Sequence, residues 1–405
     1  MRRIAYRGWT TAAAFEQGTH LGTVVREGVV AIGAEAAGTR SYVDPHGDGS
    51  VVVYEQSTWL SPEVRPGFVF SDLIPSWNAA TPEGTWVEIE VRASLDGIGM
   101  SGWYTLGRWA ESDTDIHPTS VAAQEDELAS VAIDMLTSRE PRALSTYQLR
   151  VSLLRKQGSI DTPTVRLVGA VASDVPPSAP PTAPPTAPPT APPRSEPGGA
   201  WGMVLDVPAY SQQMHLGEYP QWVGGDSWCS PTSTSMLLGF WGTGPTEEDY
   251  AWVDPAYPDR WVDHAARHTF DYGYRGTGNW SFNTAYAARF GTTAFVTRLR
   301  SLTEAEQFIR AGIPLVVTVS FKRDELDGAG YDTDGHLLTI IGFDEAGNVV
   351  SNDPASHKLP SNDKVRTIYD RAQFEQVWLG RAGGVTYVIH PPEVALPPRP
   401  AEPNW

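Results

Sequence analysis

The chain has 405 residues, of which 41% are hydrophobic and 19% are charged, and this supply of apolar side chains excludes wholesale disorder. The formal net charge of −18 excludes the electrostatic attraction by which proteins usually bind nucleic-acid backbones. A single cysteine excludes an intrachain disulfide and any cluster of cysteine ligands around a metal. No apolar run approaches the ~18 residues that a membrane-spanning helix needs, so we expect no membrane span.

The pattern of residues 1–173 predicts an all-β sandwich. Apolar and polar residues alternate in Thr85–Arg92 and Tyr147–Leu153, and shorter strand-like runs occur at Val51–Tyr54 and Val165–Val171. The aromatic residues that could form a sugar-stacking platform are Trp59, Trp77, Trp86, Trp103 and Trp109. Packing in the core is the favoured interpretation, because tryptophan usually serves burial first.

Residues 174–200 are rich in proline, and the unit Ala-Pro-Pro-Thr repeats from Ala179 to Thr190. Proline lacks a backbone N–H and fixes φ, so this tract cannot form a helix or the interior of a sheet. We expect a semi-rigid polyproline II spacer between two domains. The second domain then spans residues 201–395, and residues 396–405 form a Pro-rich tail.

Helical and strand-like patterns mix in residues 201–395, which predicts an α+β domain. Apolar runs predict strands at residues 315–321, 336–343, 348–352 and 385–389. The sequence Thr303-Glu304-Ala305-Glu306 is a capping box that predicts the start of a helix, and Asp370 predicts the start of another.

Two motifs resemble cofactor or metal sites but lack the rest of the pattern. Gly97–Gly102 matches the dinucleotide-binding spacing, yet no helix pattern follows it, so we expect a turn and no cofactor. His264 and His268 lie four residues apart, but Ala265 stands where a zinc protease carries glutamate. Asp263 or Asp271 could supply a third ligand, but packing or capping histidines are favoured and no metal is expected.

Cys229 stands between polar residues directly before Ser230 and Pro231. Serine is a good N-cap and proline a good first helical residue, so we expect a helix to begin here. The positive end of the helix dipole would favour the thiolate, which is the form of cysteine that acts as a nucleophile. The alternative, an inert buried thiol, would more naturally lie within an apolar run.

A base and an orienting group for this thiol are predicted from one hairpin. His336 begins an apolar strand, and Asp353 follows the end of the next strand. A turn at residues 344–347 would place the two side chains within one register step of a cross-strand pair. Asp332, Asp334 and Asp344 are nearer to His336 in sequence, but no comparable arrangement directs them toward it.

These segments resemble the peptidase C39-like family, which consists of cysteine peptidase domains with a papain-like fold. The resemblance covers roughly residues 204–391 and is carried by Val207–Gln212, the Cys229-Ser230-Pro231 helix start, Gly335–Leu338 and Asn352–Pro354. It implies that Cys229 is the nucleophile, His336 the general base, Asp353 its orienter and Gln212 the oxyanion donor. Gln213 and Gln221 remain alternatives for the last role, and Ser230 replaces a glycine that many relatives carry.

The resemblance implies a hydrolase that cleaves peptide or amide bonds of a peptide or protein substrate, without a cofactor. An amidase or acyltransferase with the same three residues, or an inactive papain-like binding protein, are the alternatives. The sandwich and linker resemble those of actinobacterial members of the family, so the sandwich is an accessory domain that could contact cell wall or carbohydrate. Such members are usually exported, although residues 1–16 make a poor signal peptide.

Overall fold

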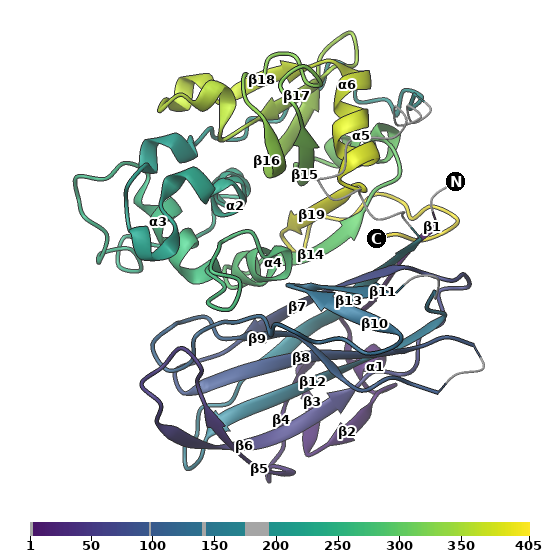
Figure 1. Cartoon of the computed structure of the whole chain (residues 1–405), viewed down its shortest axis with the longest axis vertical. Coiled ribbons are helices and arrows are strands. Elements are labelled where there is room, and N and C mark those ends of the chain that lie inside the picture. Colours follow the sequence, from purple (N-terminus) through teal and green to yellow (C-terminus); the bar gives the residue numbers. More distant parts are fainter. Residues whose placement is uncertain (1–2, 97–98, 140–142, 175–193) are drawn as a thin grey trace. The chain divides into compact units, whose positions relative to one another are not determined.

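The computed structural model describes residues 3–96, 99–139, 143–174 and 194–405 (Figure 1). Most of the predicted proline-rich spacer and part of the Gly97–Gly102 motif therefore lie outside the described residues. The chain forms two compact units, each described separately below. Unit 1 contains the described residues up to 174 together with 270–289 and Trp405, and unit 2 contains 194–269 and 290–404. Among the helices of these ranges, none combines the length and apolarity needed to cross a membrane.

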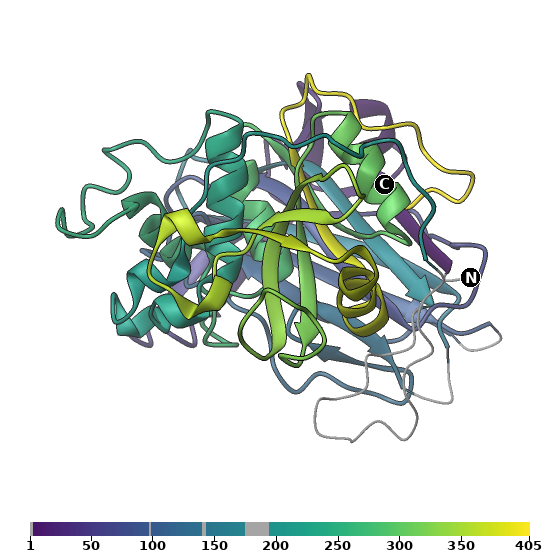
Figure 2. The same ribbon diagram turned by 90° about the horizontal axis from the view of Figure 1, so that it is seen from above.

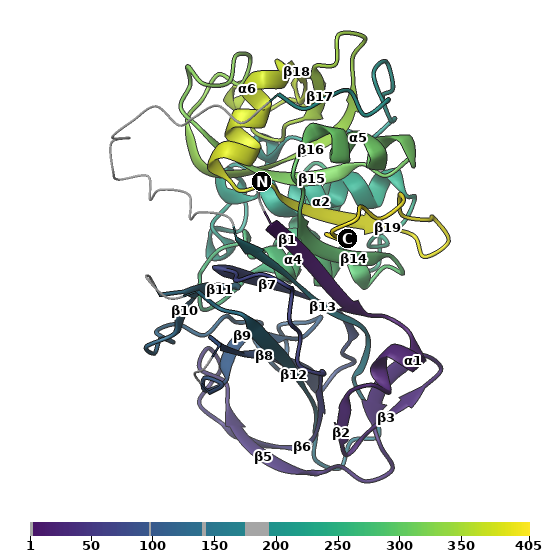
Figure 3. The ribbon, with the colours of Figure 1, turned by 90° about the vertical axis from the view of Figure 1, so that its right-hand side faces the viewer.

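Unit 1 is built from two antiparallel sheets, which Figure 3 shows as two layers. The seven-stranded sheet has the order β10-β11-β7-β13-β4-β3, with β1 paired to β13, and the six-stranded sheet has the order β2-β6-β12-β8-β9, with β5 paired to β6. The elements are β1 (Arg3–Trp9), α1 (Ala12–Phe15), β2 (Thr19–Leu21), β3 (Thr23–Arg26), β4 (Val29–Ile32), β5 (Gly38–Val43), β6 (Val51–Leu60), β7 (Asp72–Ala80), β8 (Thr85–Ser94), β9 (Tyr104–Trp109), β10 (Ala129–Ala132), β11 (Met135–Ser138), β12 (Thr146–Lys156) and β13 (Thr164–Asp174). The predicted strand-rich first half is therefore confirmed.

Tryptophans fill the space between the two sheets. The rings of Trp9 on β1 and Trp59 on β6 lie 5.5 Å apart, so they join one sheet to the other. Of the five tryptophans considered for sugar stacking, Trp59, Trp77, Trp86 and Trp109 are at most 1% exposed. Trp103 is half-buried, and the guanidinium groups of Arg92 and Arg150 lie 4.9 and 4.3 Å from its ring. Core packing is thus confirmed for four of the five.

Helix α4 (Trp280–Ala288) belongs to unit 1, although it lies more than 100 residues after β13. Asn279 caps the helix by accepting a hydrogen bond from the Phe282 amide. The Phe282 ring packs edge-on against Trp109 at 5.1 Å and Trp77 at 6.0 Å, and the Ser281 hydroxyl donates to the Pro75 carbonyl. The predicted boundary between the domains follows chain order and stays a prediction. The compact units differ from it at residues 270–289, which contain α4.

Unit 2 contains one antiparallel six-stranded sheet with the order β14-β19-β15-β16-β17-β18. Helices α2 and α3 lie at one side of this sheet and α5 and α6 at the other (Figures 1 and 2). The elements are α2 (Cys229–Phe240), α3 (Arg260–Thr269), β14 (Thr293–Arg298), α5 (Leu302–Arg310), β15 (Leu315–Phe321), β16 (Thr333–Phe343), β17 (Val349–Asn352), β18 (Arg366–Tyr369), α6 (Arg371–Glu375) and β19 (Val385–His390), with short 3₁₀ helices η1 (Gln212–His215), η2 (Pro220–Trp222), η3 (Gly225–Ser227), η4 (Ser356–Lys358) and η5 (Asn362–Lys364) and a π-helical turn (Gln376–Arg381). The four strands predicted for this half correspond to β15, β16, β17 and β19, and β17 begins one residue later than predicted.

The capping box of α5 begins two residues before the predicted one. The Ser301 hydroxyl accepts from the Glu304 amide, and the Glu304 carboxylate accepts from the Arg300 amide. Glu306, which was expected to close the box, instead forms a buried ion pair with Arg371 at 2.7 Å. The Glu306 carboxylate, which the local sequence pattern assigned to the helix terminus, therefore takes part in a long-range ion pair.

Both ends of unit 2 are hydrogen-bonded to its body. The amides of Gly198 and Ala200 donate to the Glu306 carboxylate, so the end of the predicted spacer is attached here. At the other end, the Asn404 side chain donates to the Arg298 carbonyl and accepts from Arg300. Unit 2 thus ends on a buried, paired asparagine, the next-to-last residue of the predicted Pro-rich tail.

Candidate functional site

The candidate nucleophile lies at the start of a buried helix. Cys229 is the first residue of α2 and is half-buried, whereas the following residues to Leu238 are all buried. The N-cap is Trp228 and not Ser230 as predicted, because the short helix η3 leads directly into α2. Ser230 lies inside the first turn, where its hydroxyl contacts the Tyr387 hydroxyl at 3.0 Å. The thiol still lies at the end of the helix where the dipole stabilises negative charge.

Hydrogen bonds and apolar packing hold α2 against the sheet. The Ser233 hydroxyl donates to the Leu337 carbonyl on β16 at 3.2 Å, and Ser230 reaches Tyr387 on β19. Met236 on α2 packs in one buried cluster with Ile341 and Val350 of the sheet. Because Leu337 follows His336, these contacts bring the thiol and the imidazole together.

His336 and Asp353 lie side by side, as the hairpin prediction required. His336 Nε2 is 2.8 Å from Asp353 Oδ1, and both side chains are buried. In the register of β16 and β17, Thr339 pairs with Asn352, so Asp353 is a diagonal neighbour of His336 on the same side of the sheet. Because Nε2 faces the carboxylate, Nδ1 is the ring nitrogen that remains for the Cys229 thiol, and this imidazole lowers the pKa of the thiol.

Two tyrosines that the sequence analysis missed complete the surroundings of Asp353. The hydroxyls of Tyr331 and Tyr369 donate to Asp353 Oδ2 at 2.8 and 2.6 Å. The Ala355 amide donates to Oδ1 at 2.9 Å. A carboxylate with this many donors is held in one orientation and in its ionised form. No spacing in the sequence pointed to these tyrosines, because they come from a loop and from β18.

The pKa values of the three groups are shifted in a coupled way. Burial raises the pKa of the Cys229 thiol, but the hydrogen bond and charge of His336 outweigh burial and lower it below 9.0. Burial lowers the pKa of His336, but the charge and hydrogen bond of Asp353 outweigh it and raise the pKa to about 9. Burial raises the pKa of Asp353, and the pairing with His336 and both tyrosines lowers it overall. The arrangement therefore favours a thiolate beside an imidazolium.

Gln212 forms hydrogen bonds near both Asp353 and Cys229. Its backbone amide donates to the carbonyl of Pro354, the residue after Asp353, at 3.0 Å. Its side-chain Nε2 donates to the carbonyl of Asp226, three residues before Cys229, at 2.7 Å. The alternative Gln213 is also buried, and its Nε2 has no hydrogen-bond partner among the described residues, whereas Gln221 is exposed on η2.

The aspartates nearer to His336 in sequence have other partners. Asp334 pairs with Lys322 at 2.8 Å on the surface, and Asp332 accepts from the Arg323 amide. Asp344 accepts from the amides of Ala346 and Asn348 and so holds the turn between β16 and β17. Among these four candidates, Asp353 is the one bonded to the imidazole.

Among the described residues, the group of ionisable side chains that could hold a metal is His215, Glu218 and Asp263. The predicted pair His264 and His268 does lie on one helix, α3, with the rings 4.2 Å apart. That pair is not part of the group. The sequence analysis weighed Asp263 beside His264 and His268, whereas the structure groups it with His215, which is 48 residues earlier in the chain.

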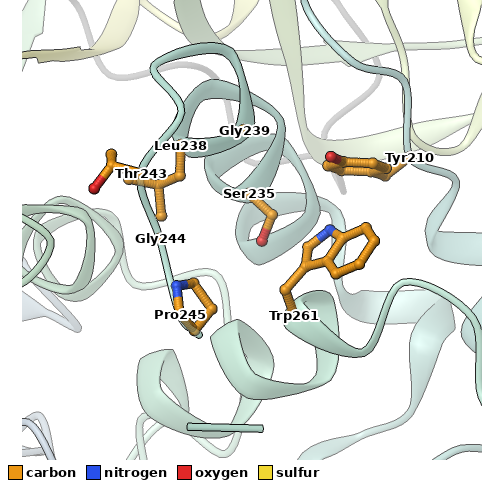
Figure 4. Close-up of a pocket in the computed structure, with 8 residues that line it drawn as sticks. All are labelled: Tyr210, Ser235, Leu238, Gly239, Thr243, Gly244, Pro245 and Trp261. Carbon is orange, nitrogen blue, oxygen red and sulfur yellow. The ribbon is translucent and has the colours of Figure 1, made fainter. Parts of the chain in front are cut away.

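A pocket flanks α2 further along the helix. Its volume is about 170 Å³, and Figure 4 shows the Ser235 hydroxyl and the Trp261 indole at its centre, with Tyr210 and Pro245 at its sides. Ser235 is six residues after Cys229, which corresponds to about 9 Å along a helix. The pocket is therefore distinct from the thiol and its partners.

Comparisons with known structures give distant likenesses. A candidate C39-like peptidase from Bacillus anthracis is 18% identical, with a TM-score of 0.29, and the match covers 46% of this chain and 96% of that one. The carbohydrate-binding module TmCBM61, solved with β-1,4-galactotriose, is 11% identical, with a TM-score of 0.18 and coverage of 40% and 97%. A laminarinase from Rhodothermus marinus is 8% identical, with a TM-score of 0.17 and coverage of 42% and 90%. At these TM-scores the likenesses carry no argument about fold or binding.

Comparisons of the sequence are more decisive. No curated protein matches the chain significantly. Residues 5–173 match the family model of the peptidase C39 N-terminal domain, and residues 204–385 match that of the peptidase C39-like family. The second match contains Cys229, His336 and Asp353. The chain thus carries an N-terminal domain of the peptidase C39 type followed by a domain that belongs to the peptidase C39-like family.

Proposed function

We propose that this protein is a cysteine hydrolase that cleaves peptide or amide bonds, with Cys229 as nucleophile, His336 as base and Asp353 as orienter. The observation that carries the proposal is the 2.8 Å hydrogen bond between His336 and Asp353, on an imidazole that also lowers the pKa of the Cys229 thiol. A nucleophile at a helix start and a base on a strand correspond to the papain-like arrangement that the family implies.

The reaction begins when His336 holds the thiol proton and the Cys229 sulfur attacks the carbonyl carbon of the substrate. The imidazolium then gives this proton to the leaving amine, and a covalent thioester remains on Cys229. A water molecule, deprotonated by His336, attacks the thioester and releases the acid product. Asp353 stays ionised throughout and stabilises the imidazolium, since it accepts from four donors.

The negative oxygen that forms during the attack needs hydrogen-bond donors. The backbone amide of Cys229 and the side-chain amide of Gln212 are the proposed donors. Gln212 Nε2 carries two hydrogens, and its bond to the Asp226 carbonyl accounts for one of them. This bond anchors the amide three residues from the nucleophile, a position that supports Gln212 over the exposed Gln221.

The test compares the full chain with its Cys229→Ala variant on peptide substrates and cell-wall amide substrates side by side. Wild-type turnover of one class and none by the variant, at an unchanged melting temperature, is the expected result. The chain has one cysteine, so iodoacetamide labelling reports on Cys229 alone. Labelling well below pH 8.5 that requires His336 supports the proposal, whereas labelling only after denaturation contradicts it. Folded wild type without turnover on any substrate would instead favour a binding protein.

A further inference from the structure

Three ionisable side chains of unit 2 converge at a buried position outside the group around Cys229. His215 ends η1, Glu218 follows it by three residues, and Asp263 lies on α3. His215 Nδ1 is 2.7 Å from Glu218 Oε2 and 3.5 Å from Asp263 Oδ2. The residues are 0%, 6% and 0% exposed, respectively. One imidazole nitrogen and two carboxylates therefore point at a common centre that solvent does not reach.

The hydrogen bonds of this group are incomplete. Both oxygens of Asp263 are buried without a hydrogen-bond partner among the described residues. A buried carboxylate normally has donors around it, as Asp353 does, because the loss of hydration is otherwise uncompensated. Besides His215, another carboxylate, Glu218, lies beside Asp263. In the part of the chain that the structure describes, the His215 imidazole faces both carboxylates, and no donor satisfies the Asp263 oxygens.

We propose that His215, Glu218 and Asp263 bind a divalent transition-metal ion, with Zn²⁺ as the best match. Zinc takes imidazole nitrogen and carboxylate oxygen at about 2.0–2.2 Å, whereas calcium prefers oxygen ligands alone. One ligand atom from each residue lies within 4.8 Å of the others, and side-chain shifts that separate His215 Nδ1 from Glu218 Oε2, which lie 2.7 Å apart, would place all three around one ion. A water molecule would supply a fourth ligand.

The ion would have a structural role. His215 and Glu218 flank a turn, and Gln212 lies on the same short helix as His215. Asp263 lies on α3, so the ion would tie the segment that carries Gln212 to that helix. The alternative occupant is a proton shared by the two carboxyl groups. Burial and the neighbouring Glu218 raise the pKa of Asp263 to about 9, which favours this shared proton at neutral pH, so zinc binding would have to release it.

The experiment uses the full chain with Cys229→Ala, because a thiol beside an imidazole is itself a zinc ligand. The protein is treated with EDTA, desalted, equilibrated with a small excess of Zn²⁺ and passed over a gel-filtration column. Zinc per chain is then measured by mass spectrometry. We expect close to one ion per chain, and close to none when Asp263→Asn or Glu218→Gln is added. The matched control His268→Gln, on the same helix as Asp263, should keep the ion.

Melting temperature gives a second measure that does not depend on activity. Zinc should raise it in the Cys229→Ala chain and in the His268→Gln control, and not in the two carboxylate variants. The proposal is overturned if the Cys229→Ala chain retains no zinc, which leaves the shared proton as the occupant. It is also overturned if a folded Asp263→Asn variant binds as much zinc as its parent, or if Ca²⁺ binds and Zn²⁺ does not.

Discussion

At the scale of single residues, the proton on His336 sets the pH range in which the proposed enzyme works. The pKa of His336 is raised to about 9, so the imidazolium persists from acid pH up to that value and is lost above it. The pKa of Cys229 is lowered, so the thiolate forms below 9.0. We expect a bell-shaped profile of kcat/KM whose alkaline side falls near pH 9 and whose acid side reports the thiol. A profile that keeps rising beyond pH 9 would mean that an ordinary thiol reacts.

Replacing Asp353 tests whether its negative charge keeps His336 protonated. Asp353→Asn removes the negative charge that raises the pKa of His336, so the alkaline side of the profile should move to lower pH. Turnover should fall on the order of 10–10²-fold, with little change in KM, and Asp353→Ala should be worse. Asp334→Asn is the matched control, since Asp334 pairs with Lys322 on the surface. Loss of activity in the control, but not in Asp353→Asn, would contradict the hairpin assignment.

The two tyrosines beside Asp353 are positioning residues. Tyr369→Phe and Tyr331→Phe each remove one hydroxyl that donates to Oδ2 and leave the ring in place. Each should lower kcat by roughly 3–10-fold at constant KM, which is less than the full effect of a hydrogen bond to a charged group because Asp353 keeps its other donors. The comparison is Tyr210→Phe, which lines the pocket beside α2. Steady-state kinetics in which all three variants are equal would remove the tyrosines from the proposed mechanism.

At the scale of elements, the turn between β16 and β17 sets the register of His336 and Asp353. Gly347 has φ of +83°, and a Cβ there would lie 2.3 Å from the Trp201 ring. Gly291 has nearly the same φ, +82°, but open space around it. Gly347→Ala should therefore lower the free energy of unfolding by more than Gly291→Ala, whose cost is about 1 kcal/mol from backbone strain alone. Equal losses in chemical denaturation would show that Trp201 moves aside.

At the scale of the whole molecule, the two compact units do not follow chain order. Residues 270–289 lie within the stretch that matches the peptidase C39-like family, yet they belong to unit 1. Phe282→Ala in the full chain should destabilise unit 1 by about 3–5 kcal/mol, because the ring is fully buried against Trp77 and Trp109. Tryptophan fluorescence during denaturation measures this loss, and the half-buried Phe240→Ala of unit 2 is the comparison. A shift below about 1 kcal/mol would contradict the packing.

The same segment predicts the behaviour of a truncated chain. Residues 195–405 alone would retain α4 without the sheets against which Phe282 packs. We expect this fragment to bind a hydrophobic dye more strongly than the full chain, and Phe282→Ser in the fragment to reduce that binding. A fragment that unfolds cooperatively and binds no dye would show that the second half is independent of residues 3–174.

The sequence by itself determined the features that depend on neighbours in the chain. Alternating apolar residues in Thr85–Arg92 and Tyr147–Leu153 predicted strands because side chains alternate across a sheet. His336 and Asp353 could be paired because a short turn leaves few choices of register. The start of α2 near Cys229 was predicted to within two residues, since its signals are local.

Only the tertiary structure decided the contacts between distant segments. Tyr369 on β18 donates a hydrogen bond to Asp353. The Ser230 hydroxyl contacts Tyr387 and does not cap the helix. Glu306 pairs with Arg371 and does not complete the predicted capping box. Asp263 meets His215 and Glu218, and not the histidines of its own helix, because the fold brings η1 against α3. Such pairs depend on how helices and sheets pack, and a pattern of period two or 3.6 records only which face of an element is buried.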